Sequence, residues 1–123
     1  MKKVLLIICT LLLALIIFAI LYREDPITIM SHEKYKDIII DDIESIEYIR
    51  YTEGGSDSRL IEDKEEIIKT YNYLNSKRIG KETDQACEDN TKVYKFNLSS
   101  SPSISIEIEC DWIIIGNERY ILE

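Results

Sequence analysis

Two cysteines in the C-terminal half, Cys87 and Cys110, are the only thiols that follow the apolar N-terminal segment and could form a structural disulfide. In an oxidising compartment, an isolated pair of thiols in a small domain most simply forms such a bond. The bond would close a loop of roughly two dozen residues and contribute about 3 kcal/mol in the chain-entropy account. Two free thiols and a redox-active pair are the alternatives, although the spacing lacks the Cys-x-x-Cys pattern of thiol oxidoreductases. The sequence therefore predicts a disulfide between Cys87 and Cys110.

Carboxylates flank both cysteines, and a disulfide would bring the two groups of carboxylates together. They are Asp84, Glu88, Asp89, Glu109 and Asp111. Clustered carboxylates and backbone carbonyls can hold calcium. The chain lacks the spacing of an EF-hand loop with its central glycine, so solvated side chains that repel one another are the favoured interpretation. We expect no metal ligand and no cofactor-binding residue, and calcium at this cluster stays an open alternative.

Catalytic groups find little support in the sequence. The single histidine, His32, precedes the expected folded domain, where it could not orient a Ser-His-Asp or Cys-His arrangement. No His/Cys cluster has the spacing of a zinc site. Ser31 and Lys34 match a Ser-x-x-Lys pattern, but the companion motifs of that enzyme class are missing. We expect a protein that is not an enzyme and has no catalytic residue.

The elements that must position these residues begin with an apolar N-terminal segment, residues 1–23. Nineteen residues from Val4 to Tyr22 carry no charge. As a helix they would be about 28 Å long, close to the hydrocarbon thickness of a bilayer. The segment lacks the Ala-x-Ala pattern of a signal-peptide cleavage site. We predict a retained transmembrane anchor; a cleaved signal peptide is the alternative, and lipid attachment at Cys9 is disfavoured because Ile8 precedes that cysteine.

Charge determines the expected orientation and limits the partners. Lys2 and Lys3 precede the span, whereas Arg23 is followed at once by Glu24 and Asp25, so the positive-inside rule places the rest of the chain outside the cytoplasm. Residues 24–123 hold all 23 acidic residues and 12 of the 15 basic ones, a formal charge of −11. Such a chain is unsuited to nucleic acid. The favoured explanation of this charge is that acidic side chains keep a small domain soluble. The more specific alternative is that the acidic surface binds a cationic partner.

Residues 24–36 are expected to form a stalk, and residues 37–123 one extracytoplasmic domain. Asp63 and Glu66 form a capping-box pattern at the start of a helix whose apolar positions are Ile67, Tyr71 and Leu74. Period-two alternation predicts strands, which are residues 45–53, 58–62, 94–98, 104–110, 112–115 and 119–122. In this pattern Cys110 continues the inward-facing set of its strand. The fold class is α+β, an antiparallel sheet with one helix packed on one face.

Three stretches carry a resemblance to a known group of proteins: "IEDKEEIIKTYNYL", "TKVYKFNL" and "ECDWIIIGNERYIL". The chain resembles small membrane-anchored extracytoplasmic domains of unknown function from low-GC Gram-positive bacteria, over about residues 40–123. The resemblance implies an extracytoplasmic location and an α+β module, and it implies no site residues.

Three classes of function follow from the anchor, the small domain and its acidity. The first is a non-catalytic interaction module at the cell envelope, of an immunity or regulatory type, with a protein or peptide partner. The second is an accessory or structural envelope protein whose exposed sheet edge joins a larger assembly. A small secreted enzyme comes third.

Overall fold

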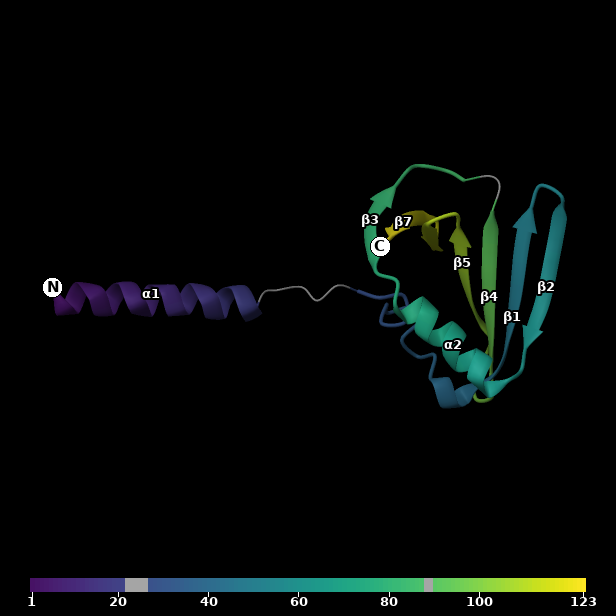
Figure 1. Cartoon of the computed structure of the whole chain (residues 1–123), viewed down its shortest axis with the longest axis horizontal. Helices are drawn as coiled ribbons and strands as arrows, with labels where there is room; N and C mark the ends of the chain where they lie inside the picture. The colour runs from purple at the N-terminus through teal and green to yellow at the C-terminus, as the bar shows by residue number, and fades with distance from the viewer. Residues whose placement is uncertain (22–26, 88–89) are drawn as a thin grey trace.

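The computed structural model describes residues 1–21, 27–87 and 90–123. In chain order the elements are α1 (Lys2–Leu21), the 3-10 helix η1 (Ile40–Asp42), β1 (Ile43–Thr52), β2 (Gly55–Ile61), α2 (Lys64–Asn75), β3 (Ile79–Thr83), β4 (Thr91–Leu98), β5 (Ile104–Glu109), β6 (Trp112–Ile115) and β7 (Glu118–Leu122). Figure 1 shows α1 apart from the sheet and α2 lying across one face of the sheet.

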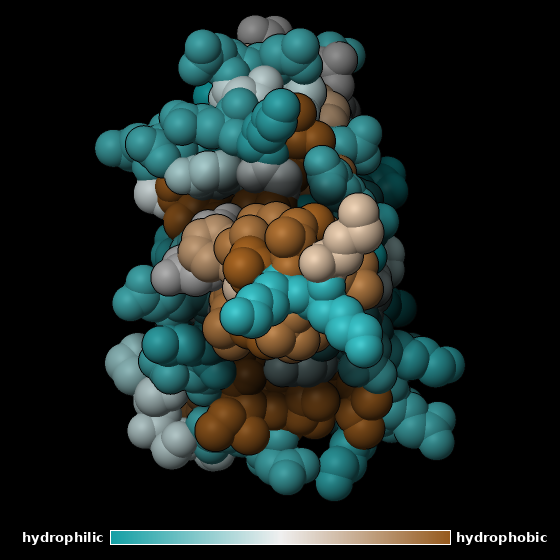
Figure 2. Space-filling view, turned by 90° about the vertical axis from the view of Figure 1, so that its left-hand side faces the viewer, coloured by the Kyte–Doolittle hydropathy of each residue, from teal (hydrophilic) through white to brown (hydrophobic). Residues whose placement is uncertain are grey.

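Helix α1 covers most of the expected anchor, whose last two residues lie outside the described part of the chain. It has 20 residues, none of them buried, and its apolar window has a mean hydropathy of 3.4. Figure 2 views α1 end-on, as a round apolar area with hydrophilic side chains at its near end, in front of a domain surface that carries both hydrophilic and hydrophobic areas. The helix is long and apolar enough to cross a membrane, a property that a signal sequence near the N-terminus shares.

The domain contains one seven-stranded antiparallel sheet with the order β2-β1-β4-β5-β6-β7-β3. With α2 on one face, this confirms the α+β fold that the alternating pattern predicts. Glycines with positive φ stand at two hairpin turns, Gly55 with φ 128° and Gly116 with φ 66°, because a side chain there would be strained. Strand β3 was not predicted, since its five residues contain one apolar side chain and no alternation.

Helix α2 begins at Lys64 with Asp63 at the N-cap position, as the sequence predicts. The Asp63 side chain makes no capping hydrogen bond, so the capping box itself is not formed. Ile67 and Leu74 are buried against the sheet. The helix is therefore stabilised mainly by the apolar face that it packs on the core.

The core lies on the helix-facing side of the sheet. Its central side chains are fully buried and come from four strands and α2: Ile46, Phe96, Ile106, Ile113 and Leu74. On β1, β4 and β5 these residues belong to the inward-facing sets that period-two alternation predicts, because successive side chains point to opposite faces.

Most of the expected stalk belongs to the folded domain, which corrects the predicted boundary at residue 37. Ile29 and Tyr35 are 0% exposed, and Met30 is 4% exposed. The Ile29 N–H donates to the Lys77 carbonyl over 3.0 Å, and Thr28 forms a β-bridge with Arg78. The segment escaped prediction because its apolar residues have neither helical nor strand periodicity. Residues 24–26 of the expected stalk lie outside the described residues.

Candidate functional site

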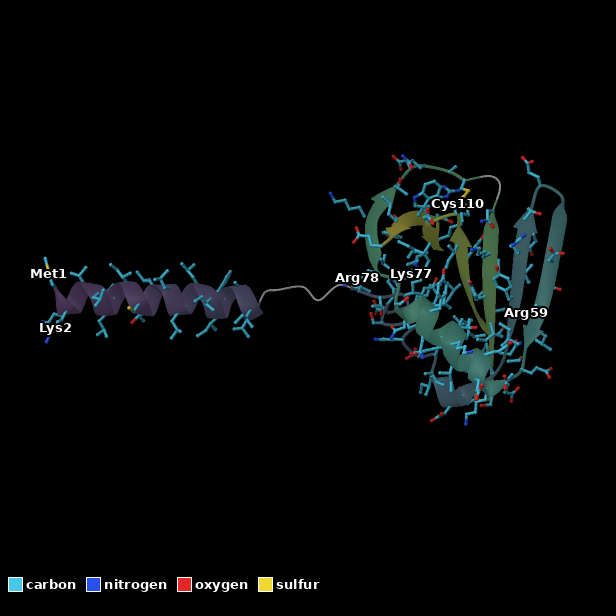
Figure 3. All side chains as sticks on the ribbon, in the orientation of Figure 1. Met1, Lys2, Arg59, Lys77, Arg78 and Cys110 are labelled. Atoms are coloured by element: carbon cyan, nitrogen blue, oxygen red, sulfur yellow. A yellow bond between two sulfur atoms is a disulfide. The ribbon has the colours of Figure 1, made fainter. Side chains whose placement is uncertain are left out.

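The sulfur atoms of Cys87 and Cys110 lie at bonding distance, and the Cα atoms are 6.1 Å apart, within the range of a disulfide. The bond ties the segment after β3 to the turn between β5 and β6. Figure 3 shows the bonded sulfur atoms beside Cys110. The third cysteine, Cys9, is free and lies in α1.

The backbone at Cys110 differs from the predicted strand. Strand β5 ends at Glu109, and Cys110 is the first residue of a two-residue turn that leads to Trp112 in β6. Its φ is 49°, in the left-handed region, because a two-residue hairpin turn requires positive φ at its first position. The Cys110 N–H donates to the Asn90 carbonyl over 2.8 Å. Cys110 nevertheless lines a pocket on the helix-facing side, together with the inward residue Ile108.

The carboxylates around the disulfide do not gather into a cation site in the part of the chain that the structure describes. No group of three potential metal ligands occurs there. Glu109 instead accepts a hydrogen bond from Arg119 Nε over 2.9 Å, which forms an ion pair on the outer face of the sheet. Glu88 and Asp89 lie outside the described residues. The carboxylates that the structure describes near the disulfide thus form no ligand set for calcium.

The residues of the Ser-x-x-Lys match have structural roles. The Ser31 hydroxyl donates to the Thr28 carbonyl over 3.1 Å and accepts from the Thr28 N–H over 2.9 Å. His32 Nδ1 accepts from the Lys34 N–H over 3.0 Å. The Lys34 ammonium lies 5.7 Å from the centre of the Tyr35 ring. These contacts hold the turn of the segment before η1.

A groove that the sequence did not predict lies between α2 and the sheet. One wall is a row on α2 and just beyond it, formed by Lys69, Tyr73 and Lys77. The four-residue spacing of Lys69 and Tyr73 places them one turn apart on one side of α2. Lys77 lies just beyond the C-cap residue Ser76. The Lys77 ammonium lies 5.4 Å from the centre of the Tyr73 ring. This wall is polar at both ends and aromatic in the middle.

The other wall is the sheet itself, where inward-facing side chains form two rows across the strands. In the first row, Tyr48 of β1 is paired with Arg59 of β2 on one side and with Tyr94 of β4 on the other. In the second row, Arg50 lies between Asp57 and Lys92. The Tyr48 and Tyr94 rings are 5.1 Å apart between centroids. The apolar core face therefore changes to aromatic and cationic residues toward this end of the sheet.

We call this surface the tyrosine–cation groove, and its residues are Tyr48, Tyr73, Tyr94, Arg50, Arg59, Lys69, Lys77 and Lys92. It consists of three adjoining hollows of about 230, 230 and 90 Å³. The first shares Tyr48 and Arg59 with the second, and Tyr73 and Tyr94 with the third. Figure 3 labels Arg59 on β2, Lys77 just after α2 and Cys110 at the β5–β6 turn, which lie around the groove.

The groove reverses the charge of the domain around it. Five of the 12 basic residues in residues 24–123 line it, against two of the 23 acidic ones, Asp57 and Asp111. Among the described residues, no ion pair neutralises any of the five cations. Burial, and then the neighbouring Tyr48 and Tyr73, raise the pKa of Tyr94 to about 12. Like an ordinary tyrosine, it is protonated at neutral pH, and the raised pKa keeps its hydroxyl a hydrogen-bond donor well into the alkaline range.

The groove is suited to binding. Its lining offers phenol hydroxyls, aromatic faces and cations. Fold and groove define a small α+β domain with a basic aromatic groove, preceded by a helix apolar enough to cross a membrane. The chain matches no protein-family model, no curated protein and no solved structure.

Proposed function

We propose that the protein is a non-catalytic binding module, anchored in the membrane by α1, that holds a protein or peptide partner outside the cytoplasm in an immunity or regulatory role. The observation that carries the proposal is the tyrosine–cation groove. Tyrosine and arginine are enriched where proteins bind one another, because they combine apolar area with hydrogen bonds and charge. Tyr73, at 49% exposed, offers its ring to a partner.

The location rests on α1 and on the disulfide. Lys2 and Lys3 begin α1 ahead of its apolar residues, and the disulfide between Cys87 and Cys110 suits an oxidising compartment. The resemblance to small extracytoplasmic domains favours the same location. Secretion after cleavage of the N-terminal segment is the alternative, and in that case the same domain would act as a soluble binder.

The mature protein is expected to keep its N-terminus and to expose its domain outside the cytoplasm. The expectation follows from an apolar helix of 20 residues without a cleavage pattern. N-terminal sequencing of protein purified from membranes tests the first part, and protease treatment of intact cells tests the second. A new N-terminus between residues 15 and 30 would show that the anchor is removed. Protection of the domain until the cells are lysed would contradict the orientation.

A photo-crosslinking amino acid at position 73 is expected to capture a partner in intact cells, and the same amino acid at position 51 is not. Tyr73 lies in the groove and is 49% exposed, whereas Tyr51 lies on the opposite face of the sheet and is 46% exposed. The two positions therefore match in residue type and exposure and differ in face. A discrete adduct from position 73 supports the proposal. Equal adducts from both positions, or none from position 73, would overturn it.

The free edge of the sheet supports the alternative of an accessory or structural envelope protein. β2 is an edge strand, and its residues from Gly55 to Leu60 are all exposed. An exposed edge can add a strand from another protein through main-chain hydrogen bonds. A crosslinker at Leu60, which is 54% exposed, distinguishes the two functions, because edge pairing would give adducts from position 60 and not from position 73.

A further inference from the structure

We infer that the tyrosine–cation groove binds an extended acidic segment of the partner protein, which crosses strands β5, β4, β1 and β2 with its carboxylates on the groove cations. The inference rests on the proposed function and specifies the chemistry of its partner. A domain with a formal charge of −11 would by itself favour a cationic partner. The groove favours an acidic partner instead, because five cations line this concave part of the surface.

The cations of the groove are available to a ligand. Lys69 and Arg59 line the first hollow, from opposite walls. No ion pair within the described chain engages either of them. A carboxylate that enters this hollow would meet a lysine from α2 and an arginine from β2, and charge-assisted hydrogen bonds are about twice as strong as neutral ones.

The distribution of the cations favours several spaced carboxylates over one compact anion. Arg59 on β2 and Lys77 just after α2 line opposite ends of the groove, and Arg50 and Lys92 lie opposite each other on β1 and β4 between them. A single phosphate would contact one end and leave the other cations unused. Acidic side chains at intervals along a peptide would engage both ends.

The dimensions of the groove match a short extended peptide. From β5 to β2 it crosses three strand spacings of about 4.8 Å, or about 14 Å in all. An extended chain advances about 3.3 Å per residue, so about four residues fill this length. Successive side chains of an extended chain point to opposite sides. Adjacent acidic residues would therefore face the α2 wall and the sheet wall in turn.

Three tyrosines line the middle of the groove and provide its apolar contact surface. Tyr48, Tyr73 and Tyr94 present rings and hydroxyls between the cationic ends. An apolar or aromatic side chain of the peptide can pack on these rings. The expected ligand thus has acidic residues around an apolar or aromatic residue.

The test uses the full chain in nanodiscs of zwitterionic lipid, panned against a random octapeptide library. We expect enrichment of peptides that carry at least two Asp or Glu residues around an apolar or aromatic residue. Their affinity for the protein should fall with added salt, because exposed charges are screened. Inorganic phosphate and single-stranded oligo(dT) serve as competitors. Displacement of the peptides by millimolar phosphate, or tighter binding of oligo(dT), would overturn the peptide as occupant.

Two matched double variants locate the binding. Lys92→Gln with Lys69→Gln removes two groove charges, and Lys95→Gln with Lys64→Gln removes two charges from the same strand and the same helix outside the groove. Lys95 lies on the opposite face of β4. We expect about a tenfold or greater loss of peptide affinity for the first variant. The second should stay within about twofold of the unmodified protein. Equal losses in both variants would overturn the groove as the site.

The outcomes separate the two proposals. Enrichment of neutral or basic peptides whose binding still requires Lys69 and Lys92 would overturn the acidic ligand and retain the binding module. Absence of enrichment over empty nanodiscs would overturn both proposals.

Discussion

A protein that begins at residue 37 is expected to lose its cooperative fold, whereas one that begins at residue 27 keeps it. The shorter protein lacks Ile29, Met30 and Tyr35, which are at most 4% exposed in the core. Burial of one such side chain contributes about 1.5–3 kcal/mol. The loss of three is comparable with the whole stability of a small domain, about 5–15 kcal/mol. Removal of the segment also takes away the backbone hydrogen bonds that Lys77 and Ile79 make with it.

Far-UV circular dichroism during urea titration measures this effect. The protein from residue 27 should unfold in one cooperative transition, and the protein from residue 37 should show none. Two point variants provide a matched pair, because Ile29 is 0% exposed and Ile27 is 52% exposed. Ile29→Ala should cost about 2–5 kcal/mol, and Ile27→Ala less than about 1 kcal/mol. A cooperative transition in the protein from residue 37, with the stability of the longer one, would show that residues 27–36 are not part of the folded domain.

The sheet could be predicted from the sequence because its strands alternate clearly. Ile104, Ile106 and Ile108 alternate with polar residues, and their inward orientation is what the structure shows. Segments without such alternation could not be predicted. β3 has only Ile79 as an apolar side chain, and residues 27–38 reach the core through turns whose apolar residues follow no repeat. The burial of residues 27–38 depends on contacts with residues just after α2, which lie far away in the sequence.

The groove could be predicted only in part. Alternation places Tyr48 and Arg50 on the inward side of β1, and it does the same for Lys92 and Tyr94 in β4. Which of these residues lie beside one another depends on the register of β1 with β2 and β4. That register is a tertiary property, which the hydrophobic pattern specifies only together with the turns. The cations of α2 and of the sheet therefore looked like scattered solvent-exposed charges in the sequence.

Loss of the disulfide is expected to lower the free energy of unfolding by about 2–5 kcal/mol, the usual cost for a small secreted domain. The bond joins residues 23 apart and holds the segment after β3 against the β5–β6 turn. Cys87→Ser with Cys110→Ser removes it, and urea titration measures the loss. Cys9→Ser is the matched control, because Cys9 is free and lies in α1, outside the domain. Free labelling of the Cys87 and Cys110 thiols under non-reducing conditions would refute the bond, and a loss below about 1 kcal/mol would refute its expected contribution to stability.

The conformation of Cys110 adds a second, separable effect. Its φ of 49° belongs to the left-handed region, which costs a residue with a side chain about 1–2 kcal/mol relative to glycine. Serine at position 110 keeps this strain, whereas glycine relieves it. In the background of Cys87→Ser, Cys110→Gly should therefore be more stable than Cys110→Ser by about 1 kcal/mol, although neither variant can form the disulfide. If serine proved the more stable, the turn would not hold position 110 in the left-handed region, and the disulfide would close on a different backbone geometry.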